Sequence, residues 1–428
     1  MQVVIQFVGL LAGLLTSIIS ARILGSECRG SFSIFSTSLN FLVVFLGFGL
    51  SYSLMYFISE EKISIQKSYN SLLFYVFLLA LFFLLLIFIE EFFSFSIFTG
   101  LTSFNEKLIL MFVVFFNLIN SIISGLLFGL KKIQDQQLST LLFYFFNIFL
   151  HFLVFLFSAF VKIDYEVFLF FYCLIMFVSV LINFYYLSKY VNLNFQFHFL
   201  EISEIRNLFF FAGLAYFANL FQFFSYKMDN YFLQNFCSLS EIGVYSLGFN
   251  LFKMFWLLPI AISSILTPIH TGQNFDVVVD NTVRVSRILF LLALLAILLS
   301  GPFLRYLIPL VYGLEFGMSS DILLCFLVGF IPVSISNILL SFFNAKGMVK
   351  YNFQYAVFTF MVTLISNYFT VPLFGVFGVV LSNIISMFLG LFVCLWHFQK
   401  VSGRRVFELF YPKRSDFAYL IKTMKPGK

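Results

Sequence analysis

Apolar runs of about twenty residues, separated by short polar breaks, recur along the whole chain. A helix of about 20 apolar residues is long enough to cross the roughly 30 Å hydrocarbon core of a bilayer. The pattern therefore predicts about twelve membrane-spanning helices joined by short loops. They are placed near residues 3–22, 33–58, 69–89, 108–130, 138–160, 167–188, 207–226, 243–266, 286–307, 322–343, 353–372 and 375–398.

The stretch from Arg206 to His270 holds two such runs and an unusual charge. Lys253 follows Gly243 by ten residues, which places it roughly 15 Å into the bilayer. A cation at that depth is costly, so it should face protein or water. Helical spacing places Lys253 on one face with Ser246, Asn250 and Trp256, so the lysine belongs to a polar stripe.

Other spans carry comparable polar stripes, and these favour a hydrated cavity. An equally open interpretation for the Asn, Gln and Ser residues is that they hydrogen-bond between helices as packing contacts. The stripes are Tyr216, Asn219, Gln222, Tyr226 and Asp229; Asn117, Asn120 and Ser124; Tyr144, Asn147, His151 and Ser158; and Ser334, Asn337, Ser341 and Asn344.

The two halves of the chain resemble each other. Gly30-Ser-Phe-Ser33 aligns with Gly243-Val-Tyr-Ser246 at an offset of 213 residues. Under this offset Lys253 corresponds to Asn40. A repeat of six spans predicts two lobes of the same orientation around a central cavity. We expect an N-terminal six-helix lobe at 1–190, a cytoplasmic connection at 191–206, a C-terminal six-helix lobe at 207–398 and a basic cytoplasmic tail at 399–428.

Composition agrees with an all-α integral membrane protein, because 61% of the residues are apolar and only 10% are charged. The five cysteines are dispersed, odd in number and form no CxxC pair, so neither a metal site nor a disulfide framework is expected. No cofactor is expected either. No predicted loop is long enough for a soluble catalytic domain, so we do not expect an enzyme. The tail is expected to rest on the anionic cytoplasmic leaflet, and its charge is too sparse to predict nucleic-acid binding.

The distribution of Lys and Arg predicts the orientation. With both termini inside, 18 of the 25 basic residues lie in cytoplasmic segments, 6 in outer segments, and Lys253 lies within a span. This excess favours cytoplasmic termini. The first span alone, with Arg22 and Arg29 after it, favours the opposite orientation; the whole-chain count is given more weight.

Three motifs resemble the polysaccharide-exporter branch of the multidrug/oligosaccharidyl-lipid/polysaccharide superfamily, the lipid-linked oligosaccharide (O-antigen) flippases. The N-terminus lacks the short basic lead that is usual in this family. The motifs are Ala21-Arg-Ile-Leu-Gly25 with Glu27, Gly30 and Phe32; Asp229 to Leu233 with Glu241 to Ser246, Pro259 and Pro268; and Asn367 with Pro372-Leu-Phe-Gly-Val-Phe-Gly378.

The resemblance implies transfer of an undecaprenyl-diphosphate-linked sugar unit, such as an O-antigen or capsule repeat, to the outer leaflet of a bacterial inner membrane by alternating access. Lys253 and Arg22 would pair with the diphosphate; for Arg22, a headgroup anchor is as plausible. Asn40, Asn219, Gln222, Asn250 and Asn337 would contact the sugars.

Coupling and partners are less defined by the sequence. Asp229 either couples transport to H⁺ or Na⁺ or pairs with Lys227, and His151 is more typical of a hydrogen-bonded helix contact than of a proton relay. Membrane lipids and the polysaccharide polymerase machinery are the expected partners.

Two alternatives are open. The first is a cation-coupled multidrug exporter of the same superfamily, although cationic drugs favour a carboxylate where this chain has Lys253. The second is a membrane-embedded polysaccharide polymerase, which would need larger outer loops.

Overall fold

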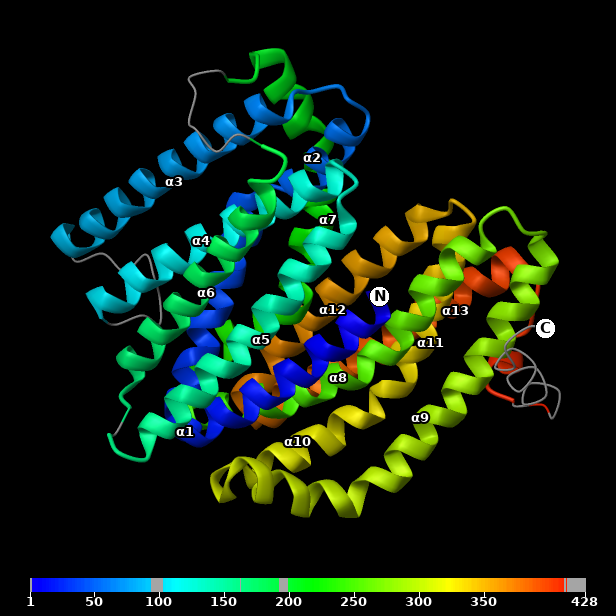
Figure 1. Ribbon diagram of the computed structural model, residues 1–428. Helices are drawn as coiled ribbons and strands as arrows, with labels where there is room; N and C mark the ends of the chain where they lie inside the picture. The colour runs from blue at the N-terminus through cyan, green and yellow to red at the C-terminus, as the bar shows by residue number, and fades with distance from the viewer. Residues whose placement is uncertain (1, 94–102, 162, 192–198, 412, 414–428) are drawn as a thin grey trace. The chain divides into compact units, whose positions relative to one another are not determined.

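The computed structural model describes residues 2–93, 103–161, 163–191, 199–411 and 413. Within these ranges the secondary structure is entirely helical, as the sequence predicts (Figure 1). The chain separates into unit 1, Met1–Phe223, and unit 2, Phe224–Lys428. Helix α7 contributes residues to both.

The described residues of unit 1 form six complete helices and the first part of a seventh. They are α1 (Gln2–Gly47), α2 (Leu50–Ser59), α3 (Ile65–Phe93), α4 (Phe104–Gly129), α5 (Ile133–Ser158), α6 (Tyr165–Leu187) and α7 (Ile202–Phe236).

In unit 2, the part of the chain that the structure describes forms the end of α7, six further α-helices and two short 3-10 helices. They are α8 (Leu239–His270), α9 (Phe275–Tyr312), η1 (Leu314–Phe316), α10 (Gly317–Val328), α11 (Phe330–Ala345), α12 (Val349–Phe374), α13 (Val376–Ser402) and η2 (Val406–Leu409).

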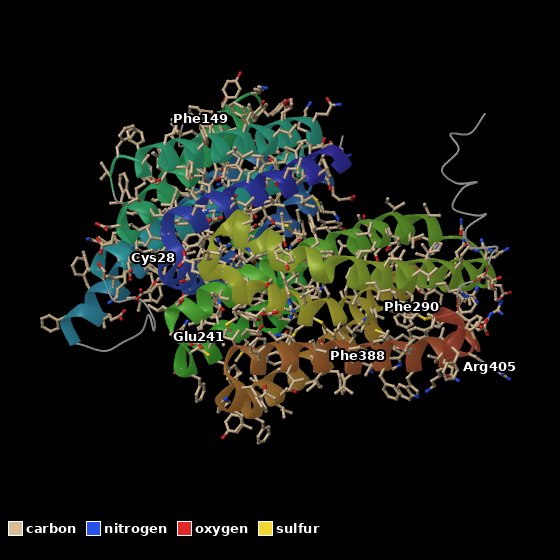
Figure 2. The ribbon with its side chains drawn as sticks, turned by 90° about the horizontal axis from the view of Figure 1, so that it is seen from below. Cys28, Phe149, Glu241, Phe290, Phe388 and Arg405 are labelled. Carbon is tan, nitrogen blue, oxygen red and sulfur yellow. The ribbon has the colours of Figure 1, made fainter. Side chains whose placement is uncertain are left out.

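The helices are those of a multi-pass membrane protein. Among the described residues, nine helices are long and apolar enough to cross a bilayer, or ten if α10 and α11, bent by 46°, form one span. The apolar part of α1 is 41 residues long, about twice what one crossing requires. Large apolar side chains such as Phe149 and Phe388 extend outward, 46% and 43% exposed (Figure 2), as lipid-facing positions should.

The first two predicted spans differ in detail from the structure. Residues 23–32, expected as a loop, are helical, and α1 instead turns sharply at Gly25 (Figure 1). Gly25 has φ 69° and ψ −179°, a conformation that only glycine adopts at little cost. The second span is broken at Phe48 and Gly49, between α1 and α2. The apolar pattern locates the helices correctly and places a break around Gly25, but it does not predict that this break is a turn within helical backbone, nor the break at Gly49.

Close backbone approach holds α4 against α2 in unit 1. A Cβ atom at Gly125 would lie 2.7 Å from the Ser51 carbonyl oxygen, and one at Gly129 would lie 2.8 Å from Ile58. Small residues four positions apart allow helices to pack closely where lipid removes most of the hydrophobic driving force. Leu54 and Leu126 are fully buried beside this contact.

In unit 2, glycines likewise allow close approach between α8 and α10 and between α12 and α13. Gly248 of α8 faces Ile322 of α10, and the Ser319 hydroxyl donates to the Val244 carbonyl oxygen at 2.8 Å. A Cβ atom at Gly378 would overlap the Thr370 backbone, so α12 and α13 form a tight hairpin.

The segment after α13 docks onto α9. Arg287 is buried, and its Nε donates to the Glu408 carbonyl oxygen at 2.5 Å, while Leu409 is fully buried. Phe290 and Arg405, both labelled in Figure 2, lie at this end of unit 2. The first part of the predicted basic tail is therefore packed against protein; residues 412 and 414–428 lie outside the described residues.

Candidate functional site

A buried carboxylate lies where four helices of unit 2 meet. Asp229 of α7 is 2% exposed. Its Oδ2 accepts hydrogen bonds from the Tyr245 hydroxyl at 2.5 Å and from Asn383 Nδ2 at 2.8 Å. Its Oδ1 accepts a hydrogen bond from Asn367 Nδ2 at 3.1 Å. We call these four residues the Asp229 cluster.

Local sequence features bring each member of the Asp229 cluster into place. Ser238 and Glu241 form a capping box that starts α8, and Tyr245 follows one turn later. Asn367 and Asn383 each lie eight residues from Gly375, where α12 ends and α13 begins. An antiparallel hairpin therefore brings both amides to the same depth.

The Asp229 cluster has the chemistry of a cation or proton site. An ionised carboxylate is costly within a bilayer unless donors or cations satisfy it, and three donors do so here. Among the described residues, Asn367 Oδ1 is buried and has no hydrogen-bond partner. A carboxylate and an amide oxygen are suitable ligands for a hard cation, and the carboxylate could alternatively hold a proton.

Lys253 and Asn250 lie on α8 in the same unit as the Asp229 cluster. Lys253 is half-buried, with its Nζ 5.1 Å from the centre of the Phe249 ring, a cation–π distance. Asn250 is exposed. Ser246 and Trp256 of the predicted stripe are buried instead, each 8% exposed. Of the predicted stripe, Asn250 and Lys253 are thus accessible, whereas Ser246 and Trp256 are packed against protein.

Arg22 and Asn40 belong to unit 1 and are both exposed. Arg22 lies on α1 three residues before the sharp turn at Gly25. Asn40 lies on the second part of α1, and its Nδ2 donates to the Ser36 carbonyl oxygen at 2.5 Å. The structure therefore places these two candidates on the two sides of the turn.

The remaining candidates are distributed over other helices. Asn337 of α11 is half-buried and donates to the Val333 carbonyl oxygen at 2.9 Å. His151 of α5 is buried, with Nδ1 2.9 Å from the Asn147 carbonyl oxygen, the predicted helix contact. The side chains of Asn219 and Gln222, like that of Lys227, lie outside the described part of the structure.

Several residues of the predicted polar stripes hydrogen-bond between helices of unit 1. Asn120 Nδ2 donates to the Ser179 hydroxyl at 3.1 Å, and its Oδ1 accepts from Asn183 Nδ2 at 2.8 Å. The Ser139 hydroxyl donates to Asn183 Oδ1 at 2.6 Å. These bonds connect α4, α5 and α6, which favours the packing interpretation for Asn120.

Sequence reasoning did not assign a role to Tyr245, Asn367 or Asn383. The signal that could have found the two amides is their equal spacing about Gly375. Tyr245 gives no comparable signal, because its approach to Asp229 depends on how α7 and α8 pack.

Comparison with solved structures gives several of similar fold. The lipid II flippase MurJ, in an inward closed conformation, is 16% identical with a TM-score of 0.69, covering 99% of this chain and 93% of that one. A multidrug resistance MATE family transporter of the MOP superfamily, inward-facing, is 14% identical with a TM-score of 0.69, covering 92% and 96%.

A third structure is a MOP superfamily transporter from Pyrococcus furiosus, whose description reports a binding pocket of reverse polarity. It is 14% identical with a TM-score of 0.57 and covers 93% of each chain. At such low sequence identities, the structural similarity shows a shared fold alone. A comparison with curated proteins gives no match.

The sequence also matches a protein family directly. The family is described as "Polysaccharide biosynthesis protein", and the match extends over residues 1–271 of 428. It includes Arg22, Lys253 and Asp229. Because the match covers more than half of the sequence, the chain belongs to this polysaccharide biosynthesis protein family.

Proposed function

We propose that the protein is a flippase for an undecaprenyl-diphosphate-linked oligosaccharide, such as an O-antigen or capsule repeat unit. It moves this lipid from the cytoplasmic to the periplasmic leaflet of a bacterial inner membrane by alternating access, and both of its termini are cytoplasmic. Its partners are the lipid-linked glycan, the surrounding lipids and the polysaccharide polymerase machinery.

The observation that carries this proposal is the family match over residues 1–271, which contains both cations assigned to the substrate. A diphosphate cannot cross hydrocarbon unaided, because desolvating its ionised oxygens costs many kcal/mol. Arg22 is exposed and Lys253 is half-buried. An arginine and a lysine can provide charge-assisted hydrogen bonds to the diphosphate.

The sugars require hydrogen bonding without charge. Asn40 and Asn250 are exposed amides, and Asn337 is half-buried. Together with Asn219 and Gln222, they are the residues we assign to the glycan hydroxyls. Amides both donate and accept hydrogen bonds, so they can replace water around many different sugars.

We assign ion coupling to Asp229. Its buried carboxylate and the Asn367 amide oxygen provide ligands for Na⁺, and the carboxylate alone can hold H⁺. Loading and release of either ion would change the net charge where α7, α8, α12 and α13 meet. Such a change can bias a two-state equilibrium by the difference in ion affinity between the states.

The decisive experiment is export of surface polysaccharide by cells that carry Lys253→Ala. We expect export to be lost while the protein still inserts in the membrane. Lys400→Ala is a matched control, because Lys400 is an exposed lysine near the end of α13 and should tolerate the change. Normal polysaccharide display by a stably expressed Lys253→Ala protein would contradict the role of Lys253.

A second candidate function is cation-coupled multidrug export, favoured by the buried carboxylate of Asp229 and by the fold shared with the MATE transporter. It predicts drug sensitivity without a change in surface polysaccharide when the gene is deleted. Loss of polysaccharide with unchanged drug sensitivity would support the flippase.

A further inference from the structure

The turn in α1 separates two arginines that have different surroundings. Arg22 precedes Gly25 and is exposed, whereas Arg29 follows Gly25 and is only 6% exposed. Both were counted as outer-loop charges in the sequence. The structure shows that Arg29 is instead an internal residue of unit 1.

The Arg29 guanidinium binds the part of α1 that precedes the turn. Its Nη1 donates to the Ser17 carbonyl oxygen at 3.0 Å, and its Nη2 donates to the Ser17 hydroxyl at 2.9 Å. The Ser20 hydroxyl lies 3.5 Å from Nη1. In a straight helix, residues twelve positions apart would be separated by about 18 Å. The contact therefore exists only because α1 turns at Gly25.

A planar guanidinium is well suited to this task. It presents several donors in a fixed geometry, and charge-assisted hydrogen bonds are stronger than neutral ones. A buried charge also makes the alternative, a straightened α1, costly, because the guanidinium would lose its acceptors on Ser17 while removed from water. Arg29 should thus hold the angle of the turn.

We infer that Arg29 is a positioning residue that fixes the turn of α1 and thereby presents Arg22 to the diphosphate of the substrate. This inference rests on the proposed function. Arg22 lies between Ser17 and Gly25, in the segment that Arg29 holds. Arg29 itself, with donors committed to Ser17, serves the site through Arg22 and is not assigned as a ligand.

The test measures binding of farnesyl diphosphate, a short isoprenyl diphosphate, to the purified full-length protein. Arg29→Lys keeps the charge but loses the two-pronged contact with Ser17. We expect it to weaken binding roughly tenfold. In an Arg22→Ala background, where the presented group is absent, the same change should have no further effect on affinity. A purely structural role for Arg29 would weaken binding by the same factor in both backgrounds.

Two hydroxyl variants refine the test. Ser17→Ala removes one of the acceptors of Arg29, the Ser17 hydroxyl, and should weaken binding in the same direction as Arg29→Lys, by a smaller factor. Thr16→Ala is the matched control, because its hydroxyl bonds to Ala12 and Gly13 within its own helical turn. It should leave binding unchanged. Melting curves in detergent check that every variant is folded.

The outcomes separate this inference from the proposed function. If the wild-type protein binds farnesyl diphosphate and Arg22→Ala weakens binding, but Arg29→Lys does not, the positioning role is wrong and the flippase proposal stands. Equal weakening by Arg29→Lys in both backgrounds also overturns the positioning role. If the wild-type protein does not bind the diphosphate, or Arg22→Ala binds it normally, the role of Arg22 and the inference from it both fall.

Discussion

At the scale of single residues, Asp229 shows how a charge can be kept inside a membrane protein. Tyr245, Asn367 and Asn383 donate to its two oxygens, and its position within four helices excludes bulk water. This arrangement supplies donors to both carboxylate oxygens but leaves the Asn367 amide oxygen, among the described residues, without a hydrogen-bond partner. In the proposed coupling role, the carboxylate would hold the ion, and this amide oxygen is a further candidate ligand.

A Na⁺ ion bound at Asp229 should stabilise the folded protein, because a ligand that binds only the folded state raises the melting temperature. We expect the melting temperature in detergent to rise with NaCl but not with equal concentrations of choline chloride. Asp229→Asn, which keeps the shape and removes the charge, should abolish the dependence. If H⁺ is the coupling ion instead, the curve will respond to pH and not to Na⁺. Neither response in the wild-type protein would contradict the coupling role.

Loss of one donor to Asp229 should destabilise unit 2. Asn383→Leu removes a hydrogen bond to a buried charge, which costs about 1–3 kcal/mol. The matched control is Asn235→Leu, since Asn235 is exposed and donates to the Tyr231 carbonyl oxygen of its own helix. It should change the free energy of unfolding by no more than about 0.5 kcal/mol. Equal effects of the two changes, measured by thermal unfolding, would show that the bond to Asp229 contributes little.

At the scale of helices, α2 and α4 are held together by backbone contact at Gly125. A Cβ atom there would lie 2.7 Å from a carbonyl oxygen and 2.9 Å from the Ser51 Cα atom, so Gly125→Ala must push the helices apart. We expect destabilisation by about 1–3 kcal/mol. Gly13→Ala is the matched control, because nothing lies within 4 Å of its Cβ position, and alanine favours the helix. A melting temperature unchanged by Gly125→Ala would mean that α2 and α4 are free to adjust.

The helices were also the most predictable part of the fold. Each predicted span overlaps a helix or helix pair of the structure, since lipid requires long apolar segments whose backbone bonds are internal. The turn at Gly25 falls in the polar break that was predicted between the first two spans, but the helical backbone on both sides of it was not predicted. The break at Gly49 escaped prediction, because apolarity continues through it. The packing of Asn120 against Ser179 and Asn183 escaped it too, because spacing along one helix does not distinguish water from a neighbouring helix.

At the scale of the whole molecule, spacing along single helices also explains why only Asp229, and none of its three partners, was predicted as a site residue. Asp229 stood out in the sequence as the only acid in the polar stripes. Its partners lie up to 154 positions away along the chain, and no periodicity within one helix connects them. The equal spacing of Asn367 and Asn383 about Gly375 could have indicated that the two amides lie at one depth, but not which helix they face.

The orientation of the whole chain is a further property that the sequence predicts. Eighteen Lys and Arg residues are assigned to cytoplasmic segments and six to outer segments, and such a bias directs insertion because basic loops are retained in the cytoplasm. A fluorescent protein fused after Lys428 should therefore be fluorescent, and alkaline phosphatase at that position should be inactive. Alkaline phosphatase inserted between Phe160 and Asp164, in the predicted outer loop after α5, should be active. The reverse pattern at both positions would contradict the predicted cytoplasmic termini.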